Sequence, residues 1–290
     1  MIPRSLVLGA LFSSVITWGE SLELGGANKI PTALFLMPQS ELKARGVGKL
    51  SGPLGYVDLT ALPQKIDFPS TPGSYKFAYH DPQKKEHRIN VFVQLPASKV
   101  VKGKLNGYRI GTYPKFGPRR QPPPDGFIEV TKENLDWKVS KSYVLGEFLC
   151  KQKASFPKFV ALKADLLKKL ERLLEFAQQR GFSWTKFTIM SGYRTPFYNK
   201  QIGNVKLSQH QYGNAADIFV DENPKDGIMD DLNHDKKHDF SDAAELFNLV
   251  EALEKSDTQT VPSGGLSAYK ANRVHGPFVH VDARGYRARW

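Results

Sequence analysis

Cysteine is almost absent from this chain of 290 residues, which contains a single one, Cys150. One thiol excludes an intramolecular disulfide, so the fold must be stable without one. Cys150 lies in the apolar stretch 145–150 and is interpreted as a buried thiol. Its distance from the N-terminus also excludes it as a lipoprotein attachment site.

Long hydrophobic runs are missing beyond the N-terminus, so no transmembrane span is expected in the mature chain. At the N-terminus, Arg4 precedes the apolar residues 6–18. A positive residue before an apolar stretch of this length is typical of a secretory signal peptide, which we predict for residues 1–20. The alternative is an apolar N-terminal helix that packs on the folded protein.

Acidic residues are outnumbered, because 29 Asp and Glu face 41 Lys and Arg, for a formal net charge of +12. Such a charge favours association with a polyanionic surface, and nucleic acid, anionic lipid or cell wall would each satisfy it. The sequence contains nothing that resembles a zinc finger, an RNA-recognition motif or a basic region with heptads. No nucleic-acid partner is therefore expected.

Segment patterns predict an α+β fold made of two units. Alternating apolar residues in 75–79 and 88–94 indicate a small, mainly β N-terminal module. Apolar residues three and four apart over 159–177 predict an amphipathic helix in the second unit. The predicted order is a signal peptide (1–20), an irregular segment (21–50), the β module (51–114), a proline-rich linker (115–126) and a C-terminal domain (127–290) with a small antiparallel sheet flanked by helices.

Three residues in the second unit have the types of an open zinc site. His210 and Asp217 are seven residues apart, and His280 lies in the apolar run 278–281 near the C-terminus. Two imidazoles and one carboxylate leave a fourth zinc position for water. A single histidine on a short strand is more often an ordinary core or surface residue, but the three together predict a metal site.

Three motifs surround these residues in the second unit: Ser191-Gly-Tyr-Arg194, Ser208-Gln-His210-Gln-Tyr-Gly-Asn-Ala-Ala-Asp217 and Phe278-Val-His280-Val-Asp282. In this order they resemble the zinc D-Ala-D-Ala peptidase family of bacterial cell-wall enzymes. The resemblance covers about residues 140 to 290, and its last motif, His-Val-Asp, is similar to the branch that includes murein endopeptidases.

The resemblance implies zinc-dependent cleavage of D-alanyl peptide bonds in peptidoglycan peptide stems, as a D,D-carboxypeptidase or an endopeptidase. It implies a periplasmic or secreted location in a bacterial cell envelope. His210, Asp217 and His280 match the zinc ligands, and Arg194 matches the arginine that approaches the scissile carbonyl and the substrate carboxylate. We also expect Ser208 to orient His210 or to bind substrate.

One departure affects the general base. Many family members carry Glu or Asp three residues before the last histidine, where this chain has Pro277. His275 can transfer protons near neutral pH, and Asp282 is a second candidate for that role. We prefer His275 as the acid–base group and Asp282 as a carboxylate that orients a ligand imidazole. The missing acid also motivates an alternative, a peptidoglycan-binding protein that keeps the zinc site without turnover.

Residues 231–242 have the spacing of a calcium-binding loop. Oxygen-bearing side chains occupy positions 1, 3, 5, 9 and 12 of that loop: Asp231, Asn233, Asp235, Asp239 and Asp242. Lys236 stands where such loops have glycine, and Asp242 replaces the usual Glu. Calcium binding remains open beside a simpler interpretation, an acidic loop that caps the next helix.

Overall fold

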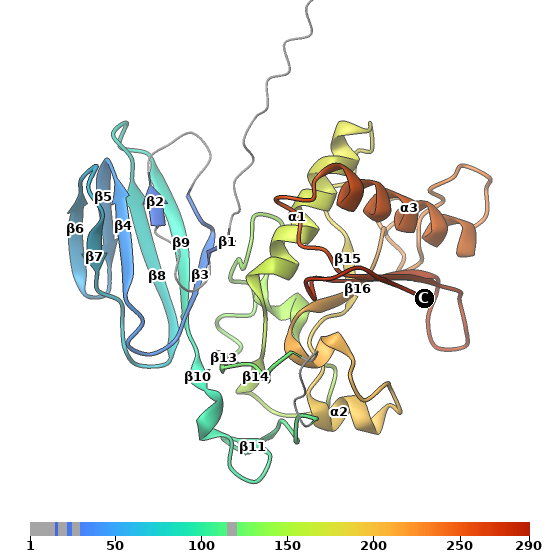
Figure 1. Cartoon of the computed structure of the whole chain (residues 1–290), viewed down its shortest axis with the longest axis horizontal. Coiled ribbons are helices and arrows are strands. Elements are labelled where there is room, and N and C mark those ends of the chain that lie inside the picture. The colour runs from blue at the N-terminus through green and yellow to red at the C-terminus, as the bar shows by residue number, and fades with distance from the viewer. Residues whose placement is uncertain (1–14, 17–21, 25–29, 115–120) are drawn as a thin grey trace, which may run out of the picture.

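A computed structural model describes residues 15–16, 22–24, 30–114 and 121–290. The signal peptide predicted for residues 1–20 lies outside the described residues, apart from 15–16. The described chain is a mixed α+β fold with several small sheets and few helices (Figure 1). No helix in these described ranges is long and apolar enough to cross a membrane.

Two sheets pack face to face in the N-terminal part. Their inward side chains form one buried cluster that includes Leu24, Leu34, Leu50 and Val91. The six-stranded sheet has the order β1 (Val15–Ile16), β3 (Ala33–Leu36), β9 (Glu86–Val93), β8 (Gly73–His80), β5 (Gly48–Gly52) and β6 (Gly55–Leu59). The three-stranded sheet has the order β2 (Leu22–Leu24), β4 (Leu42–Gly46) and β7 (Gln64–Ile66).

The opposite face of the six-stranded sheet packs against the C-terminal part. Side chains alternate between faces along a strand, so Leu34 joins the cluster between the sheets while Phe35 joins the main core. On β9, Phe92 also joins the main core, where its ring lies 5.6 Å from that of Phe35 and 6.2 Å from that of Trp137. The N-terminal sheet and the C-terminal part therefore share a hydrophobic core.

Short elements connect the two parts. β10 (Leu95–Pro96) leads through the 3-10 helix η1 (Ala97–Lys99) to a hairpin of β11 (Lys104–Leu105) and β12 (Tyr108–Arg109). β13 (Gly126–Val130) pairs with β10 on one side and with β14 (Lys158–Val160) on the other. A second 3-10 helix, η2 (Leu145–Phe148), lies between β13 and β14 in the sequence.

The C-terminal part contains a five-stranded sheet and three helices. The sheet order is β15 (Thr188–Ser191), β16 (Ala215–Phe219), β18 (Phe278–Asp282), β17 (Gly265–Tyr269) and β19 (Ala288–Arg289). The helices are α1 (Ala164–Gln179), α2 (Pro196–Gln201) and α3 (Phe240–Ser256), and η3 (Gln209–Tyr212) is a further 3-10 turn. Helices α1 and α3 pack together beside this sheet (Figure 1).

The predicted helix over 159–177 was wrong at its start. Helix α1 begins at Ala164, and Phe159 and Val160 form part of β14 instead. Their backbone pairs with Ile128 and Glu129 of β13, which competes with helix formation at these apolar positions. Lys163, at the helix N-cap, is still extended, with φ −96° and ψ 138°.

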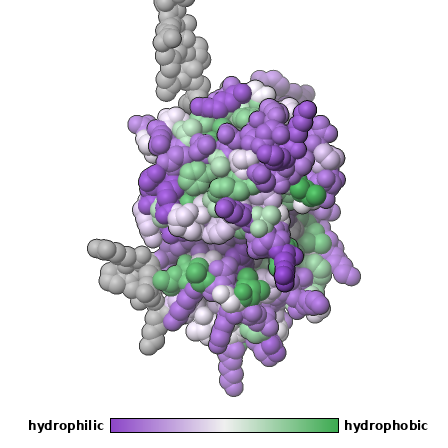
Figure 2. All heavy atoms as spheres, turned by 90° about the vertical axis from the view of Figure 1, so that its right-hand side faces the viewer, coloured by the Kyte–Doolittle hydropathy of each residue, from purple (hydrophilic) through white to green (hydrophobic). Residues whose placement is uncertain are grey.

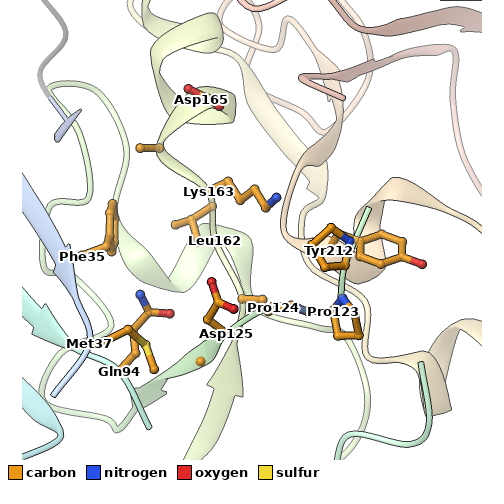
Figure 3. A pocket seen from close by; sticks show the side chains of 14 residues that line it. Phe35, Met37, Gln94, Pro123, Pro124, Asp125, Leu162, Lys163, Asp165 and Tyr212 are labelled. Carbon is orange, nitrogen blue, oxygen red and sulfur yellow. The ribbon is translucent and has the colours of Figure 1, made fainter. Parts of the chain in front are cut away.

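A small pocket lies where the N-terminal sheet, the chain entering β13 and η3 come together (Figure 3). Phe35, Pro123, Lys163 and Tyr212 are among its lining residues. Burial lowers the pKa of the Lys163 amine, and the carboxylates of Asp165 and Asp125 partly oppose this. The pocket therefore places a half-buried cation next to η3, the turn that carries His210.

Candidate metal centre

The central strands of the C-terminal sheet bring two of the predicted ligands together. β16 and β18 are antiparallel, and Asp217 lies directly opposite His280 in their register. On the other side of β16, Asp217 lies opposite Ser191 of β15, beside a register shift. Side chains at directly opposed positions lie on one face of a sheet, so the pairing alone places Asp217 next to His280.

The third predicted ligand, His210, comes from η3. This turn ends at Gly213 in the left-handed conformation, with φ +68°. A Cβ atom at Gly213 would lie 2.3 Å from the Ala161 carbonyl oxygen, so only glycine fits both the conformation and the space. The glycine lets the chain turn closely from His210 into β16.

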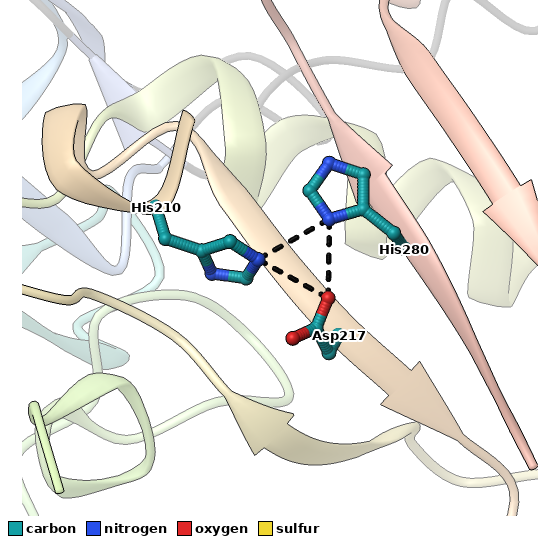
Figure 4. A group of neighbouring side chains, drawn as sticks. All are labelled: His210, Asp217 and His280. Atoms are coloured by element: carbon teal, nitrogen blue, oxygen red, sulfur yellow. Dashed lines mark hydrogen bonds and ion pairs between the residues drawn. The ribbon is translucent and has the colours of Figure 1, made fainter. Parts of the chain in front are cut away.

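The three ligand atoms converge at one point (Figure 4). His210 Nε2 lies 3.1 Å from Asp217 Oδ1 and 3.2 Å from His280 Nδ1, and His280 Nδ1 lies 3.1 Å from Asp217 Oδ1. In the part of the chain that the structure describes, this is the one group of three or more His, Cys, Asp or Glu with atoms within 4.8 Å of one another. All three residues are buried.

The outer nitrogens of both imidazoles have oxygen acceptors. His210 Nδ1 lies 2.7 Å from the Gly192 carbonyl oxygen, and His280 Nε2 lies 3.1 Å from Asp282 Oδ2. We assign the ring protons to these outer nitrogens, which leaves the inner lone pairs facing Asp217. Two imidazole lone pairs and a carboxylate oxygen form the donor set of an open zinc site, so the residues fit this metal.

The site holds Asp217 as a carboxylate. Burial alone would raise the pKa of Asp217, but hydrogen bonds and charge interactions with His210 and His280 hold it well below its usual range. Burial also lowers the pKa of His210, which favours the neutral imidazole that a metal requires.

Arg194 lies beside the ligand group. Its Nη2 donates to Asp217 Oδ2, and its Nε donates to Ser191 Oγ at 2.9 Å. The other terminal nitrogen makes no hydrogen bond to the described residues. The guanidinium therefore fixes the carboxylate and keeps donors for a further oxygen.

Asp282 lies behind His280. Its side chain is buried and accepts hydrogen bonds from the Gly265 amide at 2.7 Å and from Arg284 Nε at 2.9 Å. Burial raises its pKa, but the bonds from His280 and Arg284 lower it far more, so this group stays ionised. Asp282 therefore contacts the outer nitrogen of the His280 ring, and its orienting role remains a prediction.

His275 and Ser208 lie outside the converging group. His275 is half-buried in the loop before β18, and its ring lies 4.8 Å from that of Phe278. Its Nδ1 lies 2.8 Å from the Gly276 carbonyl oxygen, and its Nε2 accepts from the Asn272 amide at 2.8 Å. Ser208 is buried at the start of η3, two residues before His210. The acid–base role of His275 and the orienting role of Ser208 remain predictions.

Comparison with known families decides what kind of domain carries this group. Residues 141–250 match the family model described as Peptidase M15. This part of the chain is similar to the peptidase M15 family. The family is zinc-dependent in general, and the match includes Arg194, His210 and Asp217 but ends before His280. No curated protein matched the chain.

The M15 match confirms the predicted resemblance. It supports a metallopeptidase domain, and a peptidase family implies a peptide substrate.

The structure gives no support to calcium binding by residues 231–242. Among the described residues, these side chains do not form a group that could hold a metal. Instead they accept backbone hydrogen bonds: Asp231 from the amides of Asp235 and Lys236, Asp242 from those of Leu232 and Asp239. Asp239 also caps helix α3 through the Ser241 amide. The predicted alternative, an acidic loop that caps a helix, describes these contacts.

Two residues next to the candidate metal centre were not predicted from the sequence. The Trp290 ring lies 5.3 Å from that of His280, and its Nε1 donates to Tyr269 Oη at 2.7 Å. Trp290 had no motif to mark it. Arg284 could have been found, since Asp282 and Arg284 are two residues apart and extended chain places such residues on one face.

Proposed function

We propose that the chain is a zinc peptidase that hydrolyses D-alanyl peptide bonds in peptidoglycan. The observation that carries the proposal is the convergence of His210, Asp217 and His280, with both imidazole lone pairs directed inward. The M15 family match and the motif Ser191-Gly-Tyr-Arg194 support the substrate class. A periplasmic or secreted location in a bacterial envelope accompanies this substrate.

The roles of the protein's own groups follow from their contacts. His210, Asp217 and His280 would hold zinc, which when bound acts as a Lewis acid and activates water for attack on a peptide carbonyl. Arg194 fixes Asp217 and directs its remaining donors to a substrate oxygen, either the scissile carbonyl or a carboxylate. Asp282 holds the ring of His280 in place.

Proton transfer to the leaving amine is assigned to His275. To act as base or acid, its Nε2 must give up the hydrogen bond from the Asn272 side-chain amide, because the same lone pair must accept the proton. Pro277 occupies the position where relatives carry an acid and has no group that transfers protons. His275 is the nearest titratable residue along the chain before His280.

Digestion of whole sacculi tests the proposal directly. Zinc-loaded protein should release muropeptides whose masses show which bond is cut, and a chelator should abolish the products. Restoring zinc should restore them, and His210→Ala should remain inactive under every condition. Cleavage at the terminal D-alanine alone would identify a carboxypeptidase, whereas cleavage of crosslinks would identify an endopeptidase.

The second candidate is a peptidoglycan-binding protein that keeps zinc but lacks turnover, and Pro277 is the observation that favours it. It predicts that sacculi pull down the zinc-loaded protein while no chelator-sensitive product forms. Intact binding without product would replace the catalytic proposal with this one.

A further inference from the structure

A groove in the C-terminal part is lined by cations and by no carboxylate. It lies between the β11–β12 hairpin, residues 151–154 and helix α2, and its charged lining residues are Arg109, Lys151 and Lys153. All three are exposed, and none pairs with a carboxylate in the described ranges of the chain. The groove therefore presents three cations to solvent without an acidic partner.

The hairpin beside the groove concentrates like charges. Lys104 of β11 lies directly opposite Arg109 of β12 in a hairpin whose strands have two residues each. Like charges at directly opposed positions destabilise a strand pair. This repulsion destabilises a hairpin that is already very short. A bound anion would balance the two charges and remove the repulsion.

Hydrogen bonds hold the floor of the groove rigidly. The buried Gln152 side chain donates from Nε2 to the Arg109 carbonyl oxygen at 3.2 Å and accepts from Thr195 Oγ1 at 2.9 Å. The Phe197 amide donates to the Ile110 carbonyl oxygen at 3.0 Å, and the Phe197 ring lies 5.0 Å from the guanidinium carbon of Arg109. These contacts orient Arg109 before any ligand arrives.

Close packing also fixes the hairpin against helix α2. Gly111 has φ +88°, and a Cβ atom there would lie 2.6 Å from the Phe197 amide nitrogen. The glycine therefore permits an approach that no other residue allows.

The groove is linked to the candidate metal centre along the chain. Buried Thr195 donates to Gln152 in the groove floor and directly follows Arg194, whose guanidinium binds the Asp217 carboxylate. Phe197 and Tyr198, which line the groove, follow within four residues of Arg194. At about 3.8 Å between consecutive Cα atoms, this places the groove within reach of an extended peptide that contacts Arg194.

We propose that this groove binds carboxylate groups of the peptide substrate, at positions away from the scissile bond. The inference rests on the proposed peptidase function. The exposed Gln201 amide in the lining suits a peptide backbone, while the three cations select acidic side chains or a free carboxylate along it. The groove thus makes the enzyme prefer acidic peptides.

A charge-swap experiment tests the preference. Matched peptides carry Glu, Gln or Lys at two to five residues from the scissile bond, and kcat/KM is measured with the zinc-loaded full chain. The native protein should favour Glu over Gln by roughly fivefold at one or two of these positions, and the ratio should fall towards one in high salt. Arg109→Glu combined with Lys153→Glu should favour Lys over Glu at the same positions.

Controls separate the groove from general charge effects. Lys84→Glu combined with Lys85→Glu makes the same charge change as the double groove variant in the exposed turn between β8 and β9 and should keep the native preference. The neutral variant Arg109→Gln should reduce the preference without reversing it, which covers the case in which the double variant does not fold. An unchanged preference in every folded groove variant would overturn the proposal.

Binding measurements distinguish this inference from the proposed catalysis. If the native protein cleaves none of the peptides, fluorescence anisotropy should still detect salt-sensitive binding of the Glu peptide that Arg109→Glu weakens, and only the catalytic proposal then fails. Cleavage with equal kcat/KM for the Glu and Gln peptides at all positions would support the proposed catalysis and contradict the proposed role of the groove. Binding of inorganic polyphosphate or DNA in place of the Glu peptide would also overturn it.

Discussion

At the scale of single residues, the geometry of the candidate metal centre depends on the groups behind its three converging residues. The outer nitrogen of His210 bonds to a backbone carbonyl, whereas that of His280 bonds to the carboxylate of Asp282. That carboxylate is held in turn by Arg284 and by the Gly265 amide. The orientation of His280 is therefore the part of the site that side-chain substitution can alter most.

Asp282→Asn should weaken zinc affinity by about 10- to 100-fold, because the His280 ring loses its charged acceptor. Competition with a chelator of known affinity measures the change. Asp257→Asn is the matched control, since Asp257 also bonds to an arginine, Arg172 at 2.8 Å, but lies outside the metal centre. Equal zinc affinity in the Asp282 variant and the native protein would contradict the orienting role.

His275→Ala should lower kcat by about 100-fold or more while zinc content stays at the native level, because only proton transfer is lost. Zinc is measured by elemental analysis and turnover on a muropeptide. His234→Ala, in the exposed loop before α3, should match the native enzyme in both. Native turnover by the zinc-loaded His275 variant would remove this histidine from the mechanism and return attention to Asp282.

At the scale of elements, two helices are tied to the strand that carries His280 by a buried cation. Lys169 of α1 is 1% exposed, donates to the Asp282 carbonyl oxygen at 2.7 Å and pairs with Glu254 of α3. Burial lowers the pKa of Lys169, and Glu254 opposes this. Glu254 also pairs with Arg289 of β19, so the network joins α1, α3 and the sheet.

Lys169→Met should lower the free energy of unfolding by about 3 kcal/mol, because a buried ion pair loses one partner. Denaturant unfolding measures the loss. Lys255→Met is the control, since Lys255 pairs with Glu251 on the same α3 helix but is 72% exposed, and should cost about 0.5 kcal/mol or less. If both variants lose equally little, Lys169 does not stabilise the junction.

Acid should loosen the contact between α3 and β19. Burial raises the pKa of Glu251, but Arg287 and Arg289 hold it at about 2, below the value of about 4.3 for an unfolded glutamate. The resulting stabilisation is complete above the unfolded pKa and is lost as pH falls towards 2. Glu251→Gln should flatten the decline in unfolding free energy between pH 5 and 2 by about 1 kcal/mol after solvent screening. The exposed Glu245→Gln should keep the native slope.

The strands and turns near the candidate metal centre could be predicted from the sequence because each depends on a short, local motif. The apolar run at 278–281 predicts β18, and the small residues before Asp217 predict the turn into β16. The start of α1 was not readable, because Phe159 and Val160 suit a helix face equally well until β13 is present to pair with them. The cationic groove also needed the fold, since its residues come from three separate segments.

At the scale of the whole molecule, the N-terminal sheet is joined to the peptidase domain by a shared core. The sequence Ala33-Leu-Phe-Leu36 is apolar at every position because both faces of this strand are buried. Alternate residues pack into the main core and into the cluster between the two N-terminal sheets. A strand with two buried faces predicts that the two parts unfold together.

Phe92→Ala should therefore split thermal unfolding into two transitions, because it removes the ring that stacks on Phe35 and contacts Trp137. Replacing a buried phenylalanine by alanine lowers the free energy of unfolding by about 3 kcal/mol, and here the loss weakens the contact between the two parts. Ile89→Ala on the other face of β9 should destabilise the N-terminal sheets and leave the native contact intact. Calorimetry distinguishes the two, and a single transition in the Phe92 variant would show that this contact does not couple them.

The residues up to Tyr113 pack on the C-terminal part, so a cut after them would not separate the two parts of the chain. Tyr108 lies in the main core beside Phe159, and Tyr113 donates to the Gln211 carbonyl oxygen at 2.9 Å and lies 3.0 Å from Tyr193 Oη. A fragment that began after the proline-rich segment would lose both rings from the part of the chain that contains the candidate metal centre. If a protease site introduced after residue 114 were cut, nothing would be released, and the two pieces would leave a sizing column together.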